Sequence, residues 1–149
     1  MRFWLVRDED GREPVQGWPP PVESEGLWAS PMGAGLYRIE NTPWFAQNLG
    51  AYDIVEAVEY QGARVVMRKA EWSGHLTVRV AHDDPAAVLD AFADLGVRGE
   101  SAAPAYRIAA LDIPPGADLR AVVGRLRAGK ADLAWDYEEA CVTAEWRGL

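Results

Sequence analysis

The chain has 149 residues, 49% of them hydrophobic, and its 15 basic and 23 acidic side chains give a net charge of −8. This length accommodates one ordinary domain or two small ones, and the apolar content excludes a disordered chain. The acidic balance argues against nucleic acid as a partner, because binding to phosphates depends on basic residues. No apolar run approaches the ~20 residues of a membrane span, and the N-terminus lacks a signal peptide. We therefore expect a cytoplasmic protein with no membrane partner.

The two halves of the chain have the same charge. Residues 1–72 contain seven basic and eleven acidic side chains and residues 73–149 contain eight and twelve, so each half carries −4. One cysteine and two histidines are too few for an internal disulfide or the usual structural zinc site. We therefore expect no metal and no cofactor, and an acidic surface that attracts basic partners.

Residues 1–72 predict short strands separated by glycine and proline. Arg2–Arg7 alternates in the manner of a strand and ends in an acidic turn at residues 8–11. Further strands are expected at residues 26–30, 36–40, 53–60 and 63–72. The stretch Arg12–Glu25, with Trp18-Pro19-Pro20-Pro21, is interpreted as an ordered connection rather than a docking motif. Five such strands predict a small β-barrel or sandwich over residues 1–72.

The second half has a clearer order of elements. Residues 75–81 alternate strictly, and Asp84 before Pro85 is typical of a helix start, with a stop at Gly96. Strands follow near 97–100 and 106–113, then a second helix capped by Asp118 and closed by Gly129, and a last strand near 133–142. Strand-helix-strand-strand-helix-strand is the order of a ferredoxin-like βαββαβ unit, predicted for residues 73–149. The fold class is therefore α+β.

Alternation in the strand after Gly74 divides its side chains between two faces. Leu76, Val78 and Val80 should face the helices, so His75, Thr77 and Arg79 should lie on the opposite, uncovered face. On that face Arg79 is expected near Asp136 or Glu138 of the last strand, either as a structural salt bridge or as the holder of a small anionic ligand. Glu138 and Glu139 should point to opposite faces.

Two further polar side chains are weighed for chemistry. His75 follows Ser73-Gly74, which is read as a tight hairpin; it is a candidate acid or base, although a structural hydrogen bond to the backbone is the more common role. Cys141 has no basic neighbour in sequence and is read as a small buried residue.

Several segments together resemble the bacterial domain of unknown function 4265 family. The resemblance runs from about Trp28 to Cys141, and its most specific parts are an asparagine-proline-aromatic loop and a serine-glycine-histidine strand. The matching positions are Asn41, Pro43, Phe45, Ser73, Gly74, His75, Thr77 and Arg79. Trp44 and Trp72 depart from the pattern. The resemblance implies a short, typically actinobacterial protein and carries no activity with it.

Two functions remain open at this point. The first is a small acidic cytosolic binding protein, for example a partner-modulating or immunity-type protein, with an unknown protein partner. The second is a small cofactor-free enzyme of specialised metabolism that works in a groove between the halves. There His75 would be the acid or base, Arg79 would hold an anionic group and Asn41 would donate a hydrogen bond. The candidate ligand-binding residues are Asn41, His75, Thr77, Arg79, Asp136 and Glu138.

Overall fold

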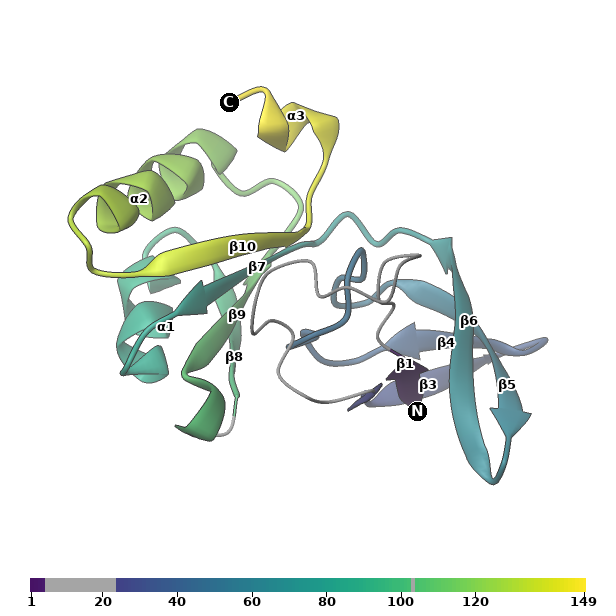
Figure 1. Ribbon diagram of the computed structural model, residues 1–149. Helices are drawn as coiled ribbons and strands as arrows, with labels where there is room; N and C mark the ends of the chain where they lie inside the picture. The colour runs from purple at the N-terminus through teal and green to yellow at the C-terminus, as the bar shows by residue number, and fades with distance from the viewer. Residues whose placement is uncertain (5–23, 103) are drawn as a thin grey trace, which may run out of the picture.

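The computed structural model describes residues 1–4, 24–102 and 104–149. Its strands form two sheets, one from each half of the sequence (Figure 1). The first sheet contains β1 (Arg2–Trp4), β2 (Ser24–Gly26), β3 (Ala29–Gly33), β4 (Leu36–Ile39), β5 (Ile54–Tyr60) and β6 (Ala63–Glu71). The second contains β7 (Leu76–Ala81), β8 (Arg98–Ser101), β9 (Ile108–Ile113) and β10 (Asp136–Cys141). The helices are α1 (Pro85–Ala93), the 3-10 turn η1 (Pro104–Tyr106), α2 (Leu119–Ala131) and α3 (Ala144–Arg147).

The first sheet is open, with the order β2-β1-β6-β5-β4-β3. A β-barrel or sandwich was predicted for residues 1–72, and no closed barrel is found among the described strands. The segment expected to be one strand at 26–30 is instead divided into β2 and β3, which lie at opposite edges of the sheet. Between them Leu27 N donates to Met1 O (2.7 Å) and Trp28 N donates to Asn41 Oδ1 (2.8 Å), so this backbone is satisfied outside the ladder. Of the predicted strand Arg2–Arg7 only β1 is described, and residues 8–23 also lie outside the described part.

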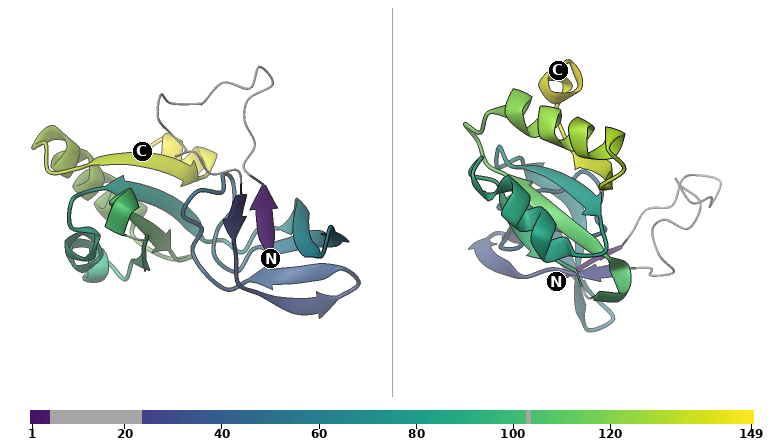
Figure 2. Two further views of the ribbon diagram at one scale, coloured as in Figure 1. Left: turned by 60° about the horizontal axis from the view of Figure 1, so that its bottom comes forward. Right: turned by 90° about the vertical axis from the view of Figure 1, so that its left-hand side faces the viewer.

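The second sheet has the order β10-β7-β9-β8, and all its neighbouring strands are antiparallel. Helices α1 and α2 cover one face of it (Figure 2). Leu76, Val78 and Val80 are at most 4% exposed and share a core with Phe92 of α1 and Leu126 of α2. The prediction that these three side chains face the helices is confirmed. Their burial is the main apolar contribution of β7 to the stability of the fold.

The helix starts agree with the sequence. The Asp84 carboxylate accepts from Ala87 N (3.3 Å) and the Asp118 carboxylate accepts from Ala121 N (3.1 Å), so both predicted caps are confirmed. The predicted stop at Gly129 is wrong, because α2 continues to Ala131. A Cβ at Gly129 would lie 2.1 Å from the Trp135 ring, so this glycine permits close packing rather than ending the helix.

Two connections also differ from the prediction. Leu133 is 92% exposed with φ of 58° and lies in the turn before β10, which begins only at Asp136. Ser73-Gly74 joins one sheet to the other instead of forming a hairpin within a sheet. Gly74 has φ of +92°, and a Cβ there would meet Pro115 Cγ at 2.8 Å, so glycine lets this connection pass against the turn after β9. In the described part of the chain no helix is long and apolar enough to cross a membrane.

Candidate functional site

We call the side of β7 that carries His75, Thr77 and Arg79 the polar face. It lies opposite the helices, as predicted, but it is not uncovered: Thr77 is 0% exposed and Arg79 is 2% exposed. The loop between β4 and β5 packs against it, and Thr77 Oγ1 donates to Leu49 O (3.2 Å). Periodicity assigns a side chain to a face of the sheet, but it carries no information on what a distant segment places over that face.

Arg79 connects the two halves of the chain. Its Nε donates to Glu138 Oε2 (3.0 Å) and its Nη1 donates to Ala46 O (3.0 Å). Gln47 Nε2 donates to the other oxygen of Glu138 (2.5 Å). Burial lowers the pKa of the Arg79 guanidinium, and the charge of Glu138 opposes that effect. Arg79 is closed off from solvent, and its observed contacts join the two halves of the chain.

Of the two carboxylates on β10 that were predicted near Arg79, only one contacts it. Glu138 is paired with Arg79 across the strands, whereas Asp136 pairs across from Ala81 and forms an exposed ion pair with Lys130 (2.8 Å). That ion pair lowers the pKa of Asp136 and raises the pKa of Lys130. Glu139 points to the helix side, where its Oε1 accepts from Trp146 Nε1 (2.9 Å), which confirms that Glu138 and Glu139 face opposite ways.

A buried carboxylate that the sequence did not single out organises the covering loop. Glu25 is 4% exposed, and it accepts the backbone N–H groups of Trp44 (2.6 Å), Phe45 (2.9 Å) and Ala46 (2.8 Å). Ala46 in turn offers its carbonyl to Arg79. No local pattern marks Glu25, because its partners lie about twenty residues away in the chain.

A second buried acid fixes the other end of the same loop. Asp53 is fully buried, and its two oxygens accept from Gly50 N (2.9 Å) and Ser73 N (2.7 Å), while Lys69 Nζ lies 3.4 Å away. The Ser73 hydroxyl donates to Ala51 O (2.6 Å). A Cβ at Gly50 would lie 2.8 Å from the His75 carbonyl oxygen, so the loop and the start of β7 are in close backbone contact.

His75 lies at the border of this network. Its Nδ1 is 2.7 Å from Asp112 Oδ1, and the Tyr52 ring meets the imidazole edge-on at 4.9 Å between centroids. The side chains of His75 and Asp112 are 16% and 15% exposed. A carboxylate on one ring nitrogen orients an imidazole and leaves the other nitrogen available, which is the arrangement of an acid–base pair.

Next to this pair lies a small hollow of about 140 Å³, which we call the polar pocket. It is lined by Glu40, Asn41, Thr42, Ala51, Tyr52, Arg98, Gly99, Glu100 and Asp112. Asn41 is therefore near the His75–Asp112 pair, but its Oδ1 already accepts from Trp28 N. Burial raises the pKa of Glu100, and the charges of Glu25 and Asp112 act in the same direction.

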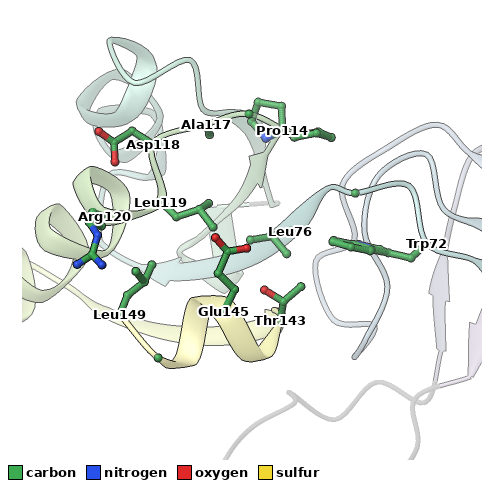
Figure 3. Close-up of a pocket in the computed structure, with 14 residues that line it drawn as sticks. Trp72, Leu76, Pro114, Ala117, Asp118, Leu119, Arg120, Thr143, Glu145 and Leu149 are labelled. Atoms are coloured by element: carbon green, nitrogen blue, oxygen red, sulfur yellow. The ribbon is translucent and has the colours of Figure 1, made fainter.

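A larger hollow, about 840 Å³, lies on the helix side of the second sheet (Figure 3). We call it the α2–α3 groove, since it runs between the start of α2, helix α3 and the connection before β7. Its principal lining residues are Trp72, Leu76, Pro114, Leu119, Glu145 and Leu149. Trp72 is 49% exposed, and its Nε1 donates to the His75 carbonyl oxygen (2.8 Å). The sequence did not predict this groove, because its walls come from three separate segments, residues 72–76, 114–120 and 143–149.

Other reactive side chains in the described residues are buried or dispersed. Cys141 is 5% exposed, and burial raises the pKa of its thiol above the ordinary value. No group of three or more histidine, cysteine, aspartate or glutamate side chains within the described ranges is arranged to hold a metal ion.

The fold and site define a mixed α+β protein of two sheets, antiparallel except for the β1–β6 pair, that buried polar side chains connect. The chain belongs to the family described as "Domain of unknown function (DUF4265)", whose model matches residues 25–137, and the resemblance seen in the sequence is confirmed. A solved structure titled "Novel crystal structure of a hypothetical protein from Neisseria gonorrhoeae" is similar in fold, with a TM-score of 0.74 and 20% identity over 94% of this chain and 93% of that one. No curated protein matches the chain.

Proposed function

We propose that this protein is a non-catalytic binding protein that holds a partner protein in the α2–α3 groove. The observation that carries the proposal is that the side chains of the polar face form hydrogen bonds within the molecule. Arg79 and Thr77 bind backbone carbonyls of the first half of the chain, and Arg79 also binds Glu138. These side chains join the two halves and leave little polar chemistry on that face for a substrate.

The α2–α3 groove supports binding through its shape and its walls. Its volume of about 840 Å³ is in the range of pockets that hold ligands or anchoring side chains. Trp72 lines it and is about half exposed to solvent, and tryptophan is one of the side chains that most often dominate the energy of an interface. Its walls combine apolar side chains with the polar Asp118, Arg120, Thr143 and Glu145, and an exposed hollow that offers both kinds of contact suits a docking site.

The proposed domains correspond to the two halves of the chain. We propose a first lobe over residues 1–72 and a ferredoxin-like lobe over residues 73–149. Support for the second comes from the strand order β10-β7-β9-β8, with α1 and α2 on one face of the sheet.

Site-specific photo-crosslinking in the native host tests the proposal. A photoreactive amino acid replaces Trp72 in one version of the protein and Val58, an exposed residue of β5, in the control. We expect one discrete protein adduct from position 72 and none of that mass from position 58. The captured protein is then purified, and its complex with this chain should be lost in the Trp72→Ala variant. A partner that binds Trp72→Ala as well as wild type would contradict the proposal.

The His75–Asp112 pair supports a second candidate function, a small cofactor-free enzyme that works at the polar pocket. The 2.7 Å contact would orient the imidazole as an acid or base toward a small substrate. The test is to incubate the protein with an extract of small metabolites and compare their consumption by wild type and His75→Ala. Loss of a turnover that wild type shows, with an unchanged melting temperature, would favour the enzyme over the binding protein.

A further inference from the structure

From the charges in the α2–α3 groove we infer the chemistry of its partner: a protein segment that places a lysine or arginine beside an apolar side chain. This inference rests on the proposed binding function and adds the class of the partner to it. Its basis is the position of Glu145 among apolar walls.

Glu145 lies in the first turn of α3, and its carboxylate points into the groove in the neighbourhood of Leu76 and Leu119 (Figure 3). Across the described residues, no ion pair or side-chain hydrogen bond engages this carboxylate. An ionised carboxylate without a partner becomes costly when an occupant excludes water from it. The occupant must therefore supply a hydrogen-bond donor, and a cation is the donor that best compensates a carboxylate.

The other charged side chains of the groove strengthen this preference. Asp118 contributes a second carboxylate. It caps α2 by accepting from Ala121 N, and its negative charge interacts favourably with the positive end of the helix dipole. Arg120 is the one basic side chain among the lining residues, so carboxylates outnumber cations there. The net charge of −8 adds a field that attracts a basic partner and speeds its association.

The apolar walls specify the rest of the partner. The exposed Trp72 and the partly exposed Leu119 form a surface on which an apolar anchor can lose contact with water, and the core residue Leu76 lines the groove between its walls with little exposed area of its own. The methylene stem of a lysine or arginine packs well on such a surface, and its charged end interacts favourably with an indole ring. A partner with one basic and one apolar side chain in adjacent positions therefore uses both features of the groove.

A displayed library of 12-residue peptides, selected on the full-length protein, tests the inference. We expect enriched peptides to share a lysine or arginine next to a leucine, isoleucine, phenylalanine or tryptophan. A synthetic representative should bind Glu145→Lys at least about tenfold more weakly than wild type, with Glu145→Gln in between. The matched control is Glu59→Lys, which makes the same charge change at an exposed site on β5 and should keep wild-type affinity.

The outcomes separate the inference from the proposed function. Some peptides could need Trp72 for binding and yet lack basic residues, or bind Glu145→Lys as tightly as wild type. Such peptides would overturn the inferred chemistry and leave docking in the groove intact. Failure to obtain any peptide whose binding depends on Trp72 would overturn both. Thermal unfolding of each variant shows that the comparison is made between folded proteins.

Discussion

Replacement of Glu25 by glutamine should destabilise the protein far more than its conservative chemistry implies. The Glu25 carboxylate accepts three backbone N–H groups at 2.6–2.9 Å and is 4% exposed. Glutamine has the same shape, but it has one acceptor oxygen and an amino group that donates. In either orientation of the amide, at least one backbone N–H loses its acceptor and faces another donor.

The magnitude follows from those bonds. An unsatisfied buried N–H costs about 1–3 kcal/mol, and each bond kept by a neutral acceptor is about 1 kcal/mol weaker than its charged counterpart. Relief from burying a charge offsets part of this sum. We expect Glu25→Gln to lower the free energy of unfolding by about 3 kcal/mol, which corresponds to a drop in Tm of about 6–12 °C for a chain of this size.

Urea unfolding followed by tryptophan fluorescence measures this change, with Glu56→Gln as the matched control. Glu56 forms a surface ion pair with Arg68 at 2.6 Å, and its loss should cost no more than about 1 kcal/mol. Amide exchange at Trp44, Phe45 and Ala46 should also accelerate in Glu25→Gln. Equal stability of the two variants, or unchanged exchange at these amides, would refute the reasoning about the covering loop.

Three further predictions address packing, charge and reactivity. Gly50→Ala should destabilise by about 1–3 kcal/mol in urea unfolding, because the added Cβ would lie 2.8 Å from the His75 carbonyl oxygen. Gly124→Ala, at an exposed position in α2 with free space around it, should instead raise the free energy of unfolding by about 0.5–1 kcal/mol. A change of the same sign in both variants would contradict the packing argument. Burial raises the pKa of Glu100, so folding favours its protonated form. Glu100→Gln should therefore unfold at higher urea than wild type at pH 7 and lose that advantage as the pH falls from the raised pKa of the folded state to the ordinary glutamate pKa of the unfolded state, and a pH-independent difference would be evidence against it. Cys141 is buried with a raised thiol pKa, so a thiol reagent at neutral pH should label it slowly when folded and rapidly in urea, and rapid labelling of the folded protein would show that the site is open.

The second half of the fold was predictable because its signals are local. Strict alternation in β7 assigned Leu76 and Arg79 to opposite faces, and that assignment is correct. Asp84 and Asp118 marked helix starts through the short-range geometry of a cap. The prediction for Gly129 was wrong because its role is not local. Glycine is needed there for contact with the Trp135 ring, six residues later, and the rule for helix ends does not include such a contact.

The first half and the site were harder to predict because they depend on distant contacts. The segment around Leu27 was read as one strand, since nothing local shows that Met1 and Asn41 would bind its backbone and divide it. Nothing local in the sequence marks Glu25 or Asp53 as buried, yet both are buried and accept backbone N–H groups from residues about twenty positions away. The same limit hid the α2–α3 groove, which exists only after three distant segments have packed together.

We expect the partner to occupy the α2–α3 groove, while the polar face joins the halves of the chain. Hydrogen–deuterium exchange of the purified complex, compared with the free protein, shows which of the two surfaces the partner covers. Binding should slow exchange in residues 114–121 and 143–149, which line the groove, and leave residues 41–52 unchanged. Slower exchange confined to residues 41–52 and 98–101, around the polar pocket, would contradict the claim and move the functional site to the His75–Asp112 pair.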